Sequence, residues 1–508
     1  MGNQLQSLDY AVFLIYFVIV SGYGYWIYQR KKAAATSASD FFLAEGALTW
    51  WAIGASLIAS NISAEQFVGM SGSGFAMGLA IASYEWMAAL TLIVVAVFFM
   101  PGYISNKIFT MPQFLEKRYS PLVATMMAVF WLLVYVFVNL TSILYLGAIA
   151  VSTISGFSFT ACASFLAIFA IIITLGGMKV IGYTDVIQVA ILVLGGLATT
   201  YLALNLVADQ FGGGGMMAGL GQLRKAAPEH FHMIFDKSNA YYKDLPGLTV
   251  LIGAMWIANL NYWGCNQYIT QRALGANIET ARTGLLFASF LKLMMPIIVV
   301  IPGIAAYVLH QKGMFQAEMM NAAGEVKPDR AYPVLLNLLG PGLKGLSFAA
   351  LTAAIVASLA GKANSIATIF TLDLYKKYMN KEAGEDTQVR IGRVAIIVSM
   401  IIAILVAPQL QKLEQGFQFI QDFTGLISPG VVAIFLLGFF WKRATANAAL
   451  VAALLTIPLG LAIKTMMPDV PFLDRMGWVF IILVALMAII SLADPKSKNN
   501  PKAMQVDT

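Results

Sequence analysis

The sequence has little cysteine and little charge. Only Cys162 and Cys265 are present among 508 residues, and both lie inside apolar segments. This gives no basis for a disulfide framework or a cysteine metal cluster. Charged residues make up 11% of the chain, whereas soluble domains carry about a quarter. The deficit argues against one or more soluble domains.

Histidine is also scarce, which bears on enzyme chemistry. The three histidines are His230, His232 and His310, and all fall in segments that we expect to be external loops. A metal site at His230 and His232 is one interpretation, but two loop histidines are more often solvated. The chain is therefore predicted not to be an enzyme, and no cofactor is expected.

Hydrophobic residues, in contrast, are abundant. They make up 59% of the chain and recur in runs of about 20 residues, the length of a membrane-spanning helix. We predict an all-α polytopic membrane protein in which residues 1–508 form a single transmembrane domain. About 13 spans are expected, near 9–28, 48–77, 79–102, 120–151, 158–175, 182–208, 247–271, 281–309, 345–378, 389–409, 413–441, 443–463 and 474–493.

Basic residues set the expected orientation of these spans. Lys and Arg cluster on alternate short loops, one of which is expected to carry Arg272 and Arg282. Basic loops are cytoplasmic, so we predict the N-terminus outside, the C-terminus inside, and the long loops 209–246 and 310–344 outside. The formal charge of +7 is explained in this way and does not indicate nucleic-acid binding. The expected location is the plasma (inner) membrane.

Polar residues interrupt two of the predicted spans. The first interruption runs from Ser60 to Gln66, and the second contains Asn259 and Asn261. Backbone can leave the helix at membrane depth only where it is buried in protein or lines a wet cavity. Two broken helices therefore predict a binding site near mid-membrane.

The spacing of the two interruptions predicts internal symmetry. One set of five consecutive spans starts at residue 48 and a second set of five starts at residue 247. The first span of each set enters the membrane from opposite sides, which is the pattern of an inverted repeat. We predict a LeuT-type 5+5 architecture with repeats near 48–208 and 247–441. One extra helix precedes the repeats, and about two follow them.

Four strings make a family resemblance specific. They read ASNISAEQFVGMSGSG, ASYEWM, NYWGCNQYITQR and ANSIATIFTLDLYKK. The chain resembles the sodium/solute symporter family, most closely its bacterial sodium/galactose branch, from the first helix to the last. The resemblance implies secondary active transport of a monosaccharide such as galactose or glucose by alternating access, with a sodium ion as the coupling partner.

The resemblance also implies a set of sugar-binding residues. Positions that match the family's hexose contacts are Gln66, Glu85, Asn259, Lys292 and Gln421. Tyr262 matches the aromatic residue that stacks on the sugar from the inner side, and Asn61 and Trp263 match its neighbours. Carboxylate, amide and ammonium groups supply the donors and acceptors that sugar hydroxyls need. Alternatively, the amides only form hydrogen bonds between helices, and Glu85 with Lys292 is only a structural ion pair.

Gates and one departure complete the expected sugar site. Met70, Tyr84 and Phe417 match the family's outer hydrophobic gate. Ala88 stands where the galactose branch has a serine lining the sugar pocket. One hydroxyl contact is therefore missing, which leaves the identity of the hexose open.

The expected cation site departs further from the family pattern. In the family, backbone carbonyls and two adjacent serine hydroxyls hold sodium between the first and eighth core helices, and hard oxygen ligands suit such an ion. The matching positions are Ala59, Ile62, Ala354 and Ser358, whereas Ala357 replaces the first serine. Asp185 matches an acidic residue on the sodium's route to the cytoplasm.

Lys362 lies four residues after Ser358, on the same helix face, where the family usually has an apolar residue. In one interpretation its side chain snorkels to the cytoplasm. In a second interpretation its ammonium replaces sodium, so that transport is sodium-independent or proton-coupled. In a third interpretation sodium still binds and Lys362 pairs only with Asp185. An engineered pair of substitutions, Ala357 with Lys362, is a fourth. A membrane sugar sensor is a remoter alternative to a transporter.

Overall fold

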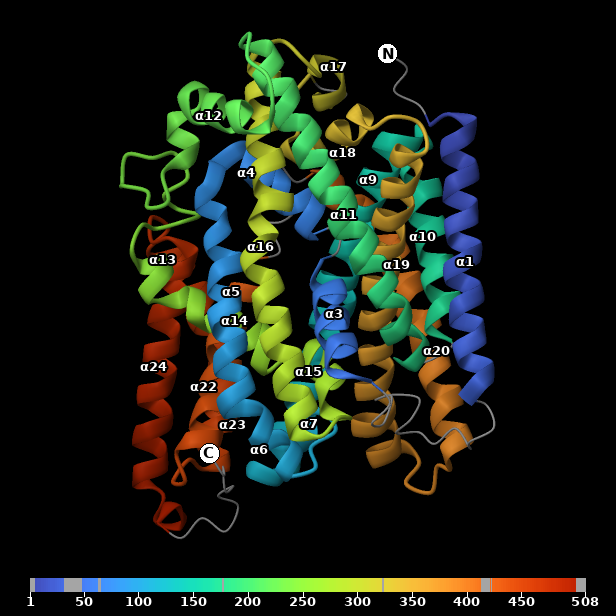
Figure 1. Ribbon diagram of the computed structural model, residues 1–508. Coiled ribbons are helices and arrows are strands. Elements are labelled where there is room, and N and C mark those ends of the chain that lie inside the picture. The colour runs from blue at the N-terminus through green and yellow to red at the C-terminus, as the bar shows by residue number, and fades with distance from the viewer. Residues whose placement is uncertain are drawn as a thin grey trace.

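Helices make up most of the structure (Figure 1). The computed structural model describes residues 5–31, 48–62, 65–175, 178–321, 324–412, 421 and 423–498. Within these residues, nine helical stretches are long and apolar enough, by length and composition, to cross a membrane. They overlap nine of the predicted spans, although the first stretch, Gln66–Ser105, also takes in the second part of the broken span 48–77. Residues 413–420 of the predicted span 413–441 lie outside the described residues. The other four predicted spans are α1, α10 and the two broken helices.

The elements that are not interrupted follow the predicted spans closely. They are α1 (Ser7–Lys31), α5 (Ser83–Val94), α8 (Pro121–Val134), α9 (Thr141–Ser155), α10 (Phe159–Thr174), α11 (Met178–Gln210), α16 (Ile278–Gln311), α19 (Leu343–Thr368), α20 (Glu385–Val406), α22 (Ser428–Phe440), α23 (Ala446–Met466) and α24 (Phe472–Ala493). Three π-helical segments extend them, namely η3 (Val95–Phe99), η4 (Tyr135–Leu140) and η8 (Ile369–Met379).

The first predicted interruption is present. Helix α3 (Trp50–Asn61) ends where the Ile62 N–H donates to the Ile58 carbonyl at 2.6 Å. The helix then resumes as η1 (Glu65–Met70) and α4 (Ser71–Met77). The polar run predicted the position of this break.

The second interruption divides its span into three pieces. They are α13 (Thr249–Ile252), α14 (Ala254–Gly264) and α15 (Gln267–Leu274). The side chain of Asn266 accepts from the Tyr268 N–H at 3.1 Å and so caps the N-terminus of α15. Asparagine is among the preferred residues at such a cap, which explains why the helix restarts here.

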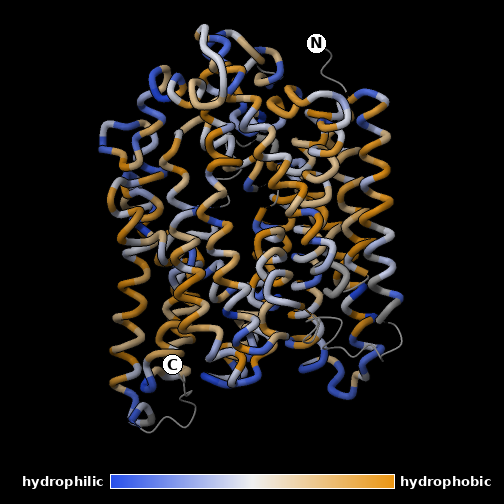
Figure 2. The backbone as a smooth tube through the Cα atoms, viewed as in Figure 1, coloured by the Kyte–Doolittle hydropathy of each residue, from blue (hydrophilic) through white to orange (hydrophobic). Residues whose placement is uncertain are grey.

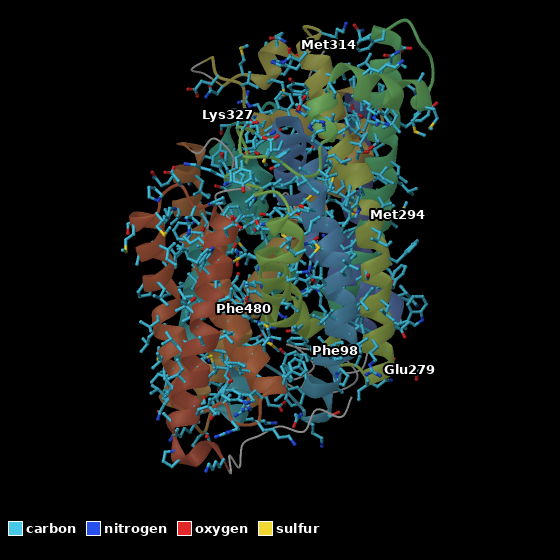
Figure 3. The ribbon with its side chains drawn as sticks, turned by 90° about the vertical axis from the view of Figure 1, so that its left-hand side faces the viewer. Phe98, Glu279, Met294, Met314, Lys327 and Phe480 are labelled. Carbon is cyan, nitrogen blue, oxygen red and sulfur yellow. The ribbon has the colours of Figure 1, made fainter. Side chains whose placement is uncertain are left out.

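Helix α16 has an exposed apolar side and a buried side. Large apolar side chains on one of its faces, Leu286, Phe290, Leu293 and Ile297, are between 40% and 59% exposed. Ser289 and Lys292 lie outside this exposed face and are buried. In Figure 3, Met294 lies partway along α16, between Glu279 in its first turn and Met314 just beyond its other end. The helix packs tightly on α3, because a Cβ on Gly54 would lie only 2.7 Å from the Gly284 carbonyl oxygen.

Polar residues concentrate at the two ends of the molecule (Figure 2). Helix α1 begins at the end that carries α12 (Met216–Ala226) and α17 (Gln316–Met319), whereas α24 finishes at the opposite end (Figure 1). This arrangement agrees with a chain whose two long loops lie on one side of a membrane. Which side is external stays a prediction.

Gly78, at the turn after α4, is expected to tolerate no side chain. Its φ of 77° and ψ of −148° place it in a region that only glycine adopts readily. A Cβ there would also lie 2.3 Å from the carbonyl oxygen of His230, which belongs to η5 (Pro228–Phe231). Gly78→Ala should therefore cost on the order of 1–3 kcal/mol for the backbone alone and lower the midpoint of thermal unfolding in detergent.

Gly221→Ala is the matched control for that substitution. Gly221 lies in α12, and a Cβ there would meet no atom within 4 Å. Alanine also favours the helix over glycine by about 1 kcal/mol. Equal unfolding midpoints for the two variants would contradict the tight packing of η5 on Gly78.

Candidate functional site

A buried ion pair joins α5 and α16. Lys292 Nζ lies 2.5 Å from Glu85 Oε2, and the two side chains are 1% and 2% exposed. The other carboxylate oxygen, Oε1, accepts from Gln66 Nε2 at 2.8 Å. A lone charge at mid-membrane costs at least about 2.5 kcal/mol on insertion scales. Pairing and hydrogen bonding therefore stabilise both charges in the interior.

Asn61 connects this ion pair to the second broken helix. Its Oδ1 accepts from Lys292 Nζ and, at 3.1 Å, from Gln66 Nε2, while its Nδ2 donates to the Tyr262 hydroxyl at 3.2 Å. Asn61 can reach all three because it is the last residue of α3, where the helix stops. Lys292 Nζ also lies 5.4 Å from the centroid of the Trp263 ring. The network thus joins α3, η1, α5, α14 and α16.

One cavity brings together eleven of the predicted sugar-site residues. Those that line it are Asn61, Gln66, Met70, Tyr84, Glu85, Ala88, Asn259, Tyr262, Trp263, Lys292 and Gln421. Asn259 Nδ2 additionally donates to the Met255 carbonyl at 3.1 Å, within its own helix. Phe417, the remaining predicted gate residue, lies outside the described residues.

The cavity has other walls that the sequence interpretation missed. Asn261 Nδ2 donates to Ser428 Oγ on α22 at 2.9 Å, and both residues line the cavity. Asn261 was visible as part of the polar interruption, although no role followed from it. The last helix, α24, contributes Phe472, Leu473 and Met476. Nothing in their sequence separates these three from apolar residues that face lipid.

A second polar group surrounds the end of α3. Ser358 Oγ on α19 lies 3.5 Å from the Ala59 carbonyl oxygen and 3.4 Å from that of Ser60. The Tyr268 hydroxyl donates to the Ser60 carbonyl at 2.7 Å. The last carbonyls of a helix lack intrahelical partners, so hard oxygens suited to a cation collect at this point. Tyr268 was not predicted to take part.

The other predicted cation-site residues are buried around this group. Ile62 is the C-cap of α3, and Ala354 and Ala357 lie on α19 within one turn of Ser358. Ala357 presents a methyl group where the family pattern expects a hydroxyl. Lys362 is 3% exposed and lines the sugar-site cavity.

Asp185 takes different partners from those expected. Its Oδ2 accepts from Ser56 Oγ at 2.6 Å, and Arg272 Nε donates to the same hydroxyl at 3.0 Å. Arg272 also donates to the Tyr268 carbonyl. Among the described residues Asp185 makes no ion pair with Lys362, so the structure does not form the Lys362–Asp185 pair of the third interpretation.

The prediction that Arg272 lies on a cytoplasmic loop was wrong. Arg272 is the sixth residue of α15 and is 1% exposed. The positive-inside rule counts basic residues near the ends of predicted spans as loop residues, so it assigned Arg272 to a loop. Here a buried carboxylate and a buried carbonyl draw the guanidinium inward, because five N–H donors can satisfy several acceptors at once.

The fold and the site define a class of protein. Two broken membrane helices that meet at a buried polar cavity are typical of secondary transporters. The chain belongs to the sodium:solute symporter family, whose sequence model matches residues 41–456. The predicted family is thereby confirmed.

Individual relatives agree with this assignment. The chain is 48% identical to a sodium/glucose cotransporter of Vibrio parahaemolyticus, a match that covers 99% of this chain and 94% of that protein. It is 34% identical to a sodium/myo-inositol cotransporter 2 of Sus scrofa, over 90% of this chain and 70% of the relative.

A solved structure shares the fold. It is described as the substrate-bound outward-open state of a Na⁺-coupled sialic acid symporter. The TM-score is 0.82 at 21% identity, and the match covers 96% of this chain and 98% of that one. The predicted LeuT-type fold is confirmed by this likeness, which concerns the fold alone.

Proposed function

We propose that this protein is a sodium-coupled symporter of a hexose. The observation that supports the proposal most strongly is the network of Glu85, Lys292, Asn61 and Gln66 on the wall of the cavity. A purely structural ion pair would have no need to line a cavity between two broken helices. The names of the relatives, a sodium/glucose and a sodium/myo-inositol cotransporter, support the same class of substrate.

The network offers what a ring of hydroxyls requires. The Glu85 carboxylate and the Asn61 amide oxygen accept hydrogen bonds, whereas the Lys292 ammonium and the Gln66 amide donate them. Asn259 and Gln421 extend this set across the cavity. The Tyr262 and Trp263 rings lie 5.0 Å apart at 76° to each other. The ring of Tyr262, at the cavity wall, can provide the flat apolar surface that a sugar face needs, with Trp263 packed against it edge to face.

In the proposed mechanism the hexose binds between the two broken helices while the inner side is closed. The repeats near 48–208 and 247–441 then rock, and Tyr262 withdraws to release the sugar to the cytoplasm. Sodium binds near Ala59, Ile62, Ala354 and Ser358 and stabilises the arrangement with high sugar affinity. Its gradient drives transport only because its affinity differs between the two arrangements.

Reconstituted protein tests this proposal. In liposomes with an inward sodium gradient, radiolabelled galactose or glucose is expected to accumulate above its external concentration. The accumulation should collapse when the gradient is removed by an ionophore, and an equal potassium gradient is the control. Uptake that only equilibrates in every condition would refute sodium coupling, and absence of hexose counterflow would refute the sugar assignment.

A further inference from the structure

Lys362 lies inside a cage of three tyrosine rings. Its Nζ is 4.1 Å from the ring centroid of Tyr268, 4.9 Å from that of Tyr135 and 6.0 Å from that of Tyr262. A cation within about 6 Å of an aromatic face is attracted by the ring quadrupole, most strongly where water is excluded. Lys362 is 3% exposed although it lines the cavity, so protein atoms cover most of the ammonium.

The cage connects three segments around the second break. Tyr262 precedes the break in α14, Tyr268 follows it in α15, and Tyr135 belongs to η4. Lys362 itself lies on α19 and also donates to Asn139 Oδ1 of η4 at 3.5 Å. One ammonium group therefore holds both sides of the broken helix against two helices that are continuous there.

The cage also adjoins the end of α3. The same Tyr268 whose ring faces the ammonium donates its hydroxyl to the Ser60 carbonyl. Ser358, one turn before Lys362, approaches that carbonyl at 3.4 Å. Tyr268 therefore contacts both the Lys362 ammonium and the Ser60 carbonyl, which is one of the oxygens suited to bind a sodium ion.

The geometry argues against the other interpretations of Lys362. A snorkelling side chain would be exposed near the end of its span, but this one is buried, 17 positions before the end of η8 at Met379. The carboxylate of Asp185 is engaged by Ser56 and lies beside Arg272 instead.

We infer that the ammonium of Lys362 is a tethered cation that holds Tyr262 and the inner side closed, sharing this task with sodium. The inference rests on the proposed hexose transport. Because Tyr262 must withdraw before sugar leaves inward, a charge that attracts its ring favours the sugar-binding arrangement in the absence of sodium. A group that favours one state raises the apparent affinity of every ligand of that state. Lys362 is thus a positioning residue that reduces the dependence of sugar binding on sodium.

Sugar binding with and without sodium provides the test. The affinity of detergent-purified protein for radiolabelled galactose and glucose is measured in sodium chloride and in choline chloride at equal ionic strength. For the wild type sodium is expected to raise the affinity by less than about 10-fold, because sodium and the Lys362 ammonium favour the same arrangement. For Lys362→Met the affinity in choline should fall at least about 10-fold while sodium restores most of it, which lies within the usual range of coupling between sites.

Tyr135 supplies a matched pair that leaves Lys362 in place. Both Tyr135→Leu and Tyr135→Phe lose the hydroxyl that donates to Asn266 Oδ1, but only Tyr135→Leu also removes a ring of the cage. Tyr135→Leu should therefore increase the effect of sodium relative to Tyr135→Phe. Wild type whose affinity already changes 10-fold or more with sodium would overturn the inference. So would a sodium effect that neither Lys362→Met nor Tyr135→Leu increases. Wild type that binds no hexose even in sodium would instead refute the proposed function, and this inference with it.

Discussion

Glu85→Ala is expected to lower hexose affinity at least about 100-fold and to abolish uptake. The substitution removes the carboxylate that would accept from ring hydroxyls, and it leaves the Lys292 ammonium buried without its partner at 2.5 Å. A hydrogen bond to a charged acceptor is worth about 1.5–3 kcal/mol, so the loss of one or two such bonds to the sugar accounts for a 100-fold change in affinity, about 2.8 kcal/mol. Binding calorimetry with galactose and glucose measures the effect.

Stability must be separated from recognition in this experiment. The double variant Glu85→Ala with Lys292→Met removes both charges, so it should recover much of the unfolding midpoint that the single variant loses. It should not recover sugar binding, because neither the acceptor nor the donor returns. A single variant that binds hexose as tightly as the wild type would refute the placement of the sugar against α5.

Arg272→Met is expected to have the second largest effect, a loss of at least about 10-fold in the rate of hexose uptake. Arg272 donates to Ser56, which donates to the Asp185 carboxylate, and it also donates to the Tyr268 carbonyl. Without the guanidinium, a carboxylate that is 1% exposed stays in the interior beside a neutral side chain. Uncompensated buried charge destabilises by several kcal/mol, and here it does so beside Ser56, one helical turn before the proposed sodium site at the end of α3.

A double-mutant cycle identifies the cause. Asp185→Asn in the Arg272→Met background removes the uncompensated charge and should restore part of the stability and uptake. Arg282→Met is the control, because Arg282 is only partly buried and its guanidinium donates to the Ala96 carbonyl at 3.2 Å on the surface of η3. Equal losses for Arg272→Met and Arg282→Met would show that a general loss of positive charge, not the Asp185 cluster, accounts for the effect.

The sequence predicted those features that depend on polar or charged residues within the membrane, where burying such residues costs free energy. Amides and charges inside apolar runs marked both breaks, as well as Glu85 and Lys292, because burying them is costly unless they pair. Helix periodicity correctly placed Lys362 near the face of Ser358. The predicted spans agree with the helices because about 20 apolar residues suffice to recognise each one.

Features that depend on distant packing were not predictable in this way. One interpretation paired Lys362 with Asp185, since opposite charges attract, but three aromatic rings from three other elements surround the ammonium instead. Arg272 was assigned to a loop because the rule for basic residues considers only distance along the chain. Ser56, four residues before Ser60 in α3, is a single serine in an apolar run, and nothing in the sequence indicated that it bridges Arg272 and Asp185.

Helix α24 lies outside the predicted repeats, yet Phe472, Leu473 and Met476 of its first two turns form part of the cavity wall. A ten-helix version of this protein, trimmed to the inverted repeat, would therefore lose a wall of its own compartment and leave the site open to detergent or lipid tails. We therefore expect the smallest working unit of this transporter to be larger than the predicted inverted repeat.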